Sequence, residues 1–133
     1  KLTAQRGKKL LVEDTSKKRN TFVDILIEKN DGEKIILDTK YKKFASSDDF
    51  SNADVFQVST YCLLHKAKHA ILLYPKWDTS APKKDFHLNI DNPGESDIYQ
   101  IDFKTINLQY DYIGKKENLE SIKEDIKRIL NVA

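Results

Sequence analysis

The sequence is poor in the residues and runs that mark disulfide-rich or membrane-spanning proteins. Its one cysteine, Cys62, excludes an internal disulfide framework and is typical of a reducing compartment, so we expect a cytoplasmic protein. No apolar run approaches the roughly 18 residues that a membrane-spanning helix needs. Methionine is absent and the first residue is Lys1, so we expect a fragment of a longer protein, its C-terminal part, or a processed product.

The composition is that of a folded domain. The 133 residues are 39% hydrophobic and 33% charged, which favours a globular chain over a disordered one. That length predicts a single domain over residues 1–133 with a core of its own. A formal net charge of +2 gives no overall basicity from which nucleic-acid binding could be inferred, so such a function must be argued from individual residues.

Two strands joined by a short turn are predicted near the start of the chain, at residues 21–28 and 34–42. The turn is Asn30-Asp31-Gly32, and glycine in third place suits a three-residue hairpin loop whose last residue is left-handed. Closing this loop between Lys29 and Glu33 fixes the register of the two strands by counting outward.

That register places two carboxylates face to face. Asp24 falls opposite Asp38, on the face that also carries Lys40, and opposed Cβ atoms lie roughly 4.5–5.5 Å apart, where like charges repel. Mg²⁺ between them would remove the repulsion, since it takes one or two protein carboxylates plus waters and substrate phosphate. The backbone carbonyl of Thr39 would be a third ligand, Lys40 would orient an attacking water, and Lys42 would touch a phosphate. The alternative is a solvated sheet face on which Lys40 neutralises one of two surface acids.

The remaining chain predicts an α/β (mixed α+β) fold with a central mixed β-sheet flanked by helices. The apolar run at 35–37 indicates a central strand covered on both faces, and the run at 70–75 indicates a buried strand parallel to one of the strands before the helical crossover. The other expected elements are a brief strand at 9–12, a helix capped by Asp54 and running to about 66, an edge strand at 85–90, a strand at 98–108 and a final helix capped by Asn118.

Gln57 and Tyr61 stand four residues apart and therefore share one side of the first helix. In the functional interpretation Gln57 reaches the metal site or a DNA phosphate, while in the plain one it completes a capping box with Asp54 and Tyr61 is partly buried. The spacing of the histidines matches no metal motif, so a surface location is expected. The predicted core face of this helix is Val55, Phe56, Ser59, Cys62 and Leu63, and the histidines are His65, His69 and His87.

Asp24, then Asp38-Thr39-Lys40, then Gln57-x-x-x-Tyr61 resembles the PD-(D/E)xK nuclease superfamily with its helical QxxxY motif. The surrounding VDILIE, ILDTKYK, ADVFQVSTYCLL and AILLYP are similar in particular to the McrC-type nuclease subunit of 5-methylcytosine (modification-dependent) restriction systems. The resemblance covers about residues 22–75. Val23 stands where the motif name has proline, and Glu13 is the nearest upstream acid.

The resemblance implies a restriction-endonuclease-like fold and Mg²⁺-dependent cleavage of DNA phosphodiesters, with Mn²⁺ as a substitute. It implies Asp24, Asp38 and Lys40 as catalytic residues, supported by Gln57 and Tyr61. It also implies a McrB-type AAA+ GTPase partner, contacted through regions outside this chain, and dimerisation for double-strand cleavage. Two alternatives stay open: another nuclease of the superfamily, serving DNA repair or a mobile element, and a catalytically silent DNA-binding or assembly module.

Overall fold

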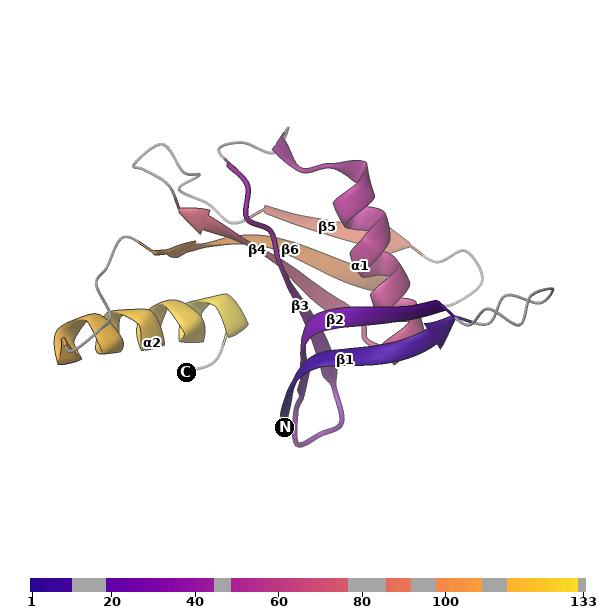
Figure 1. Cartoon of the computed structure of the whole chain (residues 1–133), viewed down its shortest axis with the longest axis horizontal. Helices are drawn as coiled ribbons and strands as arrows, with labels where there is room; N and C mark the ends of the chain where they lie inside the picture. The colour runs from indigo at the N-terminus through magenta and orange to yellow at the C-terminus, as the bar shows by residue number, and fades with distance from the viewer. Residues whose placement is uncertain (11–18, 45–48, 77–85, 92–97, 109–114, 132–133) are drawn as a thin grey trace.

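The fold is a six-stranded mixed sheet with one helix on each face, as a computed structural model shows (Figure 1). The structure describes residues 1–10, 19–44, 49–76, 86–91, 98–108 and 115–131. The expected α/β class is confirmed. The elements are β1 (Leu2–Leu10), β2 (Arg19–Glu28), β3 (Lys34–Thr39), α1 (Asn52–His65), β4 (His69–Lys76), β5 (Phe86–Asp91), β6 (Ile98–Asn107) and α2 (Lys116–Leu130).

The strand order is β1-β2-β3-β4-β6-β5, so β3 and β4 occupy the middle of the sheet. β1, β2 and β3 form an antiparallel meander, β4 pairs parallel to both β3 and β6, and β5 pairs antiparallel at the edge. The helix α1 provides the crossover from β3 to β4 that a parallel pair needs. The predicted parallel strand and edge strand are both confirmed. No helix in the described part of the chain is long and apolar enough to cross a membrane.

The β2–β3 turn forms as the sequence predicts. The Lys29 amide donates to the Glu33 carbonyl oxygen at 2.8 Å, and Gly32 takes φ of +86°. This is the left-handed backbone that glycine adopts without steric cost. The counted register is confirmed where Glu28 pairs with Lys34, and the ladder ends at the pair Ile25 and Leu37.

Each face of the sheet has its own apolar core, and β3 contributes to both. Ile36 packs on the α1 side, whereas Ile35 and Leu37 pack on the α2 side. This confirms the prediction of a central strand covered on both faces. The strand ends at Thr39, three residues earlier than predicted, so Lys40 and Lys42 lie just beyond it. At the other end of the meander, β1 begins at Leu2 rather than at residue 9.

The predicted cap of α1 is wrong, and its predicted core face is confirmed only for Val55 and Cys62. Ser51 is the N-cap, and its hydroxyl accepts from the Asp54 amide at 3.1 Å. Phe56 and Leu63 are 68% and 67% exposed. The buried positions form one helical stripe that is rotated from the predicted face: Val55, Val58, Tyr61, Cys62 and His65. The predicted surface location of His65 is therefore wrong. His69 is partly buried, and the side chain of His87 lies outside the described residues.

The helix α2 packs on the sheet through its C-terminal end. Ile129 is 1% exposed, whereas Leu119 and Ile126 are each 43% exposed. Figure 1 shows the N-terminal half of the helix extending past the sheet. The predicted start at Asn118 is wrong, because the N-cap is Lys115.

Ile129 and Ile126 therefore provide a matched pair on one helix. We expect Ile129→Ala to lower the free energy of unfolding by about 2–5 kcal/mol, because it leaves a cavity between α2 and the sheet. Ile126→Ala should cost less than about 1 kcal/mol, because its side chain is half solvated. Urea denaturation of both variants checks this, and equal losses would contradict the described docking of α2.

Candidate active site

The predicted site residues meet on the α1 face of the sheet, where β3 ends. The Lys40 ammonium nitrogen lies 2.5 Å from Asp38 Oδ2 and donates to Gln57 Oε1 at 2.6 Å. Gln57 Nε2 in turn donates to Tyr61 Oη at 2.8 Å. One continuous chain of contacts therefore joins β3 to α1. The Asp38–Lys40 contact is an ion pair that is poorly aligned for a hydrogen bond.

The backbone explains why Lys40 points at α1 although it lies beyond the strand. Asp38 and Thr39 still pair with β4, opposite Leu72 and Leu73. The Lys40 amide then donates to the Leu73 carbonyl oxygen at 2.9 Å, which extends the pairing by one residue. Because side chains alternate along extended backbone, Lys40 keeps the face of Asp38.

Asp24 is attached to the end of β3 through its side chain. Its Oδ2 accepts from the Thr39 amide at 2.8 Å and from Thr39 Oγ1 at 2.7 Å. The predicted direct opposition of Asp24 and Asp38 lies one position beyond the last backbone pair, and these two hydrogen bonds connect the strands there. Asp24 thus holds Thr39, the residue whose carbonyl is the predicted third ligand.

Asp38 is buried, with 3% of its surface exposed. Burial raises the pKa of its carboxyl above the ordinary value. Lys40 opposes this rise, while the charges of Asp24 and Asp54 add to it. Ionised Asp38 is therefore costly in the folded protein, and a cation bound against it would reduce that cost.

Asp54 is a site residue that the sequence analysis assigned only to helix capping. It forms an ion pair with Lys42, and its Oδ1 lies 3.9 Å from the Lys40 ammonium nitrogen. Burial acts to raise the pKa of Asp54, but hydrogen bonds with Lys42 and Ser51 outweigh it, so the pKa lies below the ordinary value. Lys42, predicted to touch a phosphate, is held in this pair.

The donor set suits a hard divalent cation. Asp24, Asp38 and the Thr39 carbonyl offer oxygen only, and the charge of Asp24 raises the pKa of Asp38. Mg²⁺ takes such a small protein set together with waters and phosphate. No group of three or more His, Cys, Asp or Glu that could hold a metal is present among the described residues, so no all-protein cage is found there.

A second D-x-K sequence, Asp102-Phe103-Lys104, lies on the opposite face of the sheet. Asp102 Oδ2 lies 2.9 Å from His69 Nε2, and Asp102 Oδ1 accepts from Gln100 Nε2 at 2.7 Å. Burial acts to raise the pKa of Asp102, but the bonds from His69 and Gln100 lower it overall. Lys104 donates to Asn131, the C-cap of α2, at 3.3 Å. Because both oxygens of Asp102 are used internally, this cluster has a structural role, and the tripeptide alone does not identify a site.

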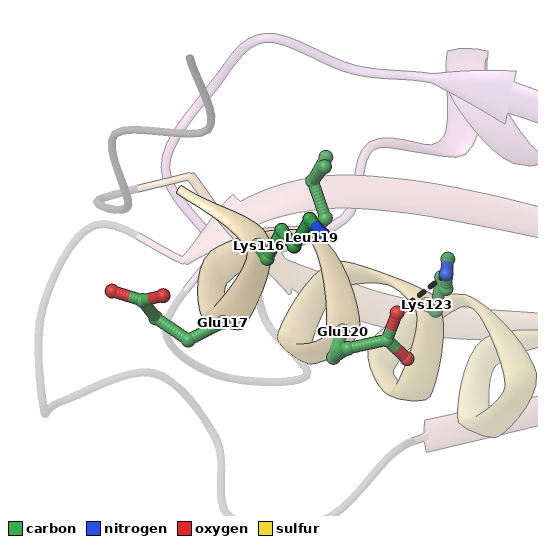
Figure 2. Close-up of a pocket in the computed structure, with 5 residues that line it drawn as sticks. All are labelled: Lys116, Glu117, Leu119, Glu120 and Lys123. Carbon is green, nitrogen blue, oxygen red and sulfur yellow. Dashed lines mark hydrogen bonds and ion pairs between the residues drawn. The ribbon is translucent and has the colours of Figure 1, made fainter. Parts of the chain in front are cut away.

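A surface pocket lies elsewhere, along the N-terminal half of α2. Figure 2 shows its side chains spread along the exposed helix, with Lys123 paired to Glu120 at 2.5 Å. It shares no residue with the site at the end of β3. An exposed pair of this kind contributes little to stability and offers no enclosed chemistry. Its lining residues are Lys116, Glu117, Leu119, Glu120 and Lys123.

The fold resembles that of a solved chain in a refined half-complex from a tetradecameric assembly of Thermococcus gammatolerans McrB AAA+ hexamers with bound McrC. The TM-score is 0.59 at 15% sequence identity, and the match covers 98% of this chain. The present chain spans 28% of that solved chain. No curated protein matches the sequence.

A family model matches residues 1–75, which is more than half of the chain. That segment contains Asp24, Asp38, Lys40, Gln57 and Tyr61, and it ends within β4. The chain therefore belongs to the family described as McrBC 5-methylcytosine restriction system component.

Proposed function

We propose that this domain is a Mg²⁺-dependent DNA endonuclease, the cleavage module of a modification-dependent restriction system. The observation that carries the proposal is the Lys40 ammonium held between Asp38 and Gln57, 2.5 and 2.6 Å away. Asp24 is tied to the same strand end through Thr39. Two carboxylates and an oriented lysine form a set suited to phosphodiester hydrolysis.

Each residue has a separate task in this mechanism. Asp24, Asp38 and the Thr39 carbonyl would hold Mg²⁺, which when bound supplies Lewis-acid activation of water and neutralises phosphate charge. Lys40 orients the attacking water by donating a hydrogen bond and offsets the charge that develops on the phosphate oxygens. Gln57 accepts from Lys40 and donates to Tyr61, so α1 sets the direction of the ammonium group.

The proposed partners are DNA and a McrB-type AAA+ GTPase. The family match supports a restriction-system role, and the similar solved chain comes from an assembly of McrB hexamers with bound McrC. This chain spans 28% of that one, and we propose that the GTPase contacts segments outside it. One site cleaves one strand, so a double-strand break needs two domains.

Removal of the Lys40 charge should slow cleavage strongly without unfolding the domain. We expect Lys40→Met to reduce the rate with Mg²⁺ or Mn²⁺ by about 10²–10³-fold, the usual loss when a transition-state donor is removed. Lys43→Met removes an exposed lysine three residues away and should stay within a few-fold of wild type. Nicking of methylated plasmid, with the GTPase partner present, measures this, and equal rates for the two variants would remove Lys40 from the mechanism. A wild type that binds DNA without cutting it would instead support the silent-module alternative.

Metal binding can be tested without DNA. We expect Asp38→Asn to weaken Mn²⁺ binding at least about 10-fold, because a charged ligand is lost at the buried end of the site. Asp31→Asn makes the same change in the exposed β2–β3 turn and should leave the affinity unchanged. Isothermal titration calorimetry of the three proteins checks this, and equal affinities would exclude Asp38 as a ligand.

The same variant should be more stable than wild type at neutral pH. The pKa of Asp38 is raised in the folded state, so stability is greatest below its unfolded value and falls as pH rises through the folded pKa. Asp38→Asn removes this loss of stability, because asparagine does not ionise. Lys40 keeps its hydrogen bond to Gln57 in the variant. We expect a melting temperature above that of wild type at pH 7, with the difference shrinking as pH falls toward 4. A difference that grows on acidification would contradict this sign.

A further inference from the structure

Tyr74 on β4 has a hydroxyl group that the site described above does not use. Its side chain is 0% exposed, and among the described residues nothing bonds to its Oη. A buried hydroxyl without a partner destabilises the folded state, and native structures seldom leave one so. Either the residue is retained at a cost, or its partner is a small molecule.

The sheet register places Tyr74 beside Lys40. Thr39 pairs with Leu73, so Tyr74 is one step further along β4, next to the position that Lys40 occupies beyond β3. Paired positions share a face, and Tyr74 belongs to the core on the α1 side. The ring is fixed there by stacking on Phe44, with the centroids 4.5 Å apart and the planes 15° apart.

Two carboxylates act electrostatically on the hydroxyl. Burial raises the pKa of Tyr74 most, and the charges of Asp54 and Asp38 raise it further. Both carboxylates also surround the Lys40 ammonium, at 3.9 Å for Asp54 Oδ1 and 2.5 Å for Asp38 Oδ2. The longer of these distances exceeds a direct hydrogen bond, so Lys40 does not occupy Asp54 Oδ1, which can accept from a water beside the ammonium group.

We propose that the Tyr74 hydroxyl binds one buried water molecule that links it to Lys40 and Asp54. Two donors, Tyr74 Oη and Lys40 Nζ, and the acceptor Asp54 Oδ1 supply the two to four polar partners that a buried water requires. Lys40 also donates to Gln57 Oε1 and forms an ion pair with Asp38, so an N–H remains for the attacking water. Tyr74 is then a positioning residue that immobilises the ammonium group through water. This inference deepens the proposed function, since it concerns the same lysine.

Replacement of Tyr74 by phenylalanine tests the proposal in the free chain, without DNA or metal. We expect the hydrogen exchange of the Lys40 ammonium group, followed by ¹⁵N NMR, to become at least about 10-fold faster, because a bond to a charged donor is lost. The melting temperature should fall or stay level, because the ring packing on Phe44 is kept. Tyr99→Phe makes the same change at the other end of the sheet and should alter neither quantity.

If the Tyr74 hydroxyl binds no water, Tyr74→Phe raises the melting temperature and leaves Lys40 exchange unchanged. That result would show the proposal to be wrong. A lower melting temperature with unchanged exchange also overturns it, because the hydroxyl would then bond elsewhere. Should the variant not fold, a wild-type crystal structure decides: the expected water lies within hydrogen-bond distance of Tyr74 Oη and Asp54, and ordered solvent without it contradicts the proposal.

The readout separates this inference from the proposed function. If the wild type does not cleave DNA but Tyr74→Phe accelerates Lys40 exchange, the nuclease proposal is wrong and the water proposal stands. If cleavage depends on Lys40 but Tyr74→Phe leaves Lys40 exchange unchanged, the water proposal is wrong and the nuclease proposal stands.

Discussion

The contact between Lys40 and Gln57 is the interaction on which the site depends. It joins the end of β3 to α1, and without it the lysine would have only acidic neighbours to direct it. A lysine side chain has many rotamers, and fixing it costs conformational entropy. The hydrogen bond from Gln57 to Tyr61, whose side chain is buried, holds the Gln57 side-chain amide in place. That amide in turn orients the Lys40 ammonium group. The QxxxY spacing therefore has a physical purpose: it supplies a rigid, neutral acceptor from a helix.

The placement of the carboxylates carries a cost in stability. Asp38 lies in a buried position that raises its pKa, and the neighbouring acids raise it further. A fold selected for stability alone would use a neutral residue there. Asp102 shows the contrast on the opposite face, since its buried carboxylate is satisfied by His69 and Gln100 and its pKa is lowered. The same D-x-K spacing thus gives a structural ion cluster on β6 and, on β3, a buried carboxylate whose pKa is raised.

Local signals in the sequence predicted the hairpin, and the structure brings several of the predicted site residues together. Gly32 and the turn before it determined the register, and the register brought Asp24 to the end of β3. Lys40 and Gln57 were grouped through the motif, and the structure brings them into contact. That they act on a metal and on DNA stays a prediction.

The predictions that were wrong or incomplete concern burial and side-chain partners, which tertiary packing determines. Phe56 and Leu63 are apolar, yet the rotation of α1 on the sheet leaves them exposed and buries His65, which hydropathy alone does not reveal. Asp54 was interpreted as a cap because its partners Lys42 and Lys40 come from another element. Tyr74 lies within an apolar run and carries no motif, so only the register of β4 against β3 places it beside the site.

Crystals grown with Mn²⁺ and measured at its absorption edge test the central claim most directly. The account predicts one anomalous peak within coordination distance of the Asp24 and Asp38 carboxylates and the Thr39 carbonyl, and its loss in Asp38→Asn crystals. No peak at the end of β3, or a peak that persists in the variant, would contradict the metal-dependent nuclease centre.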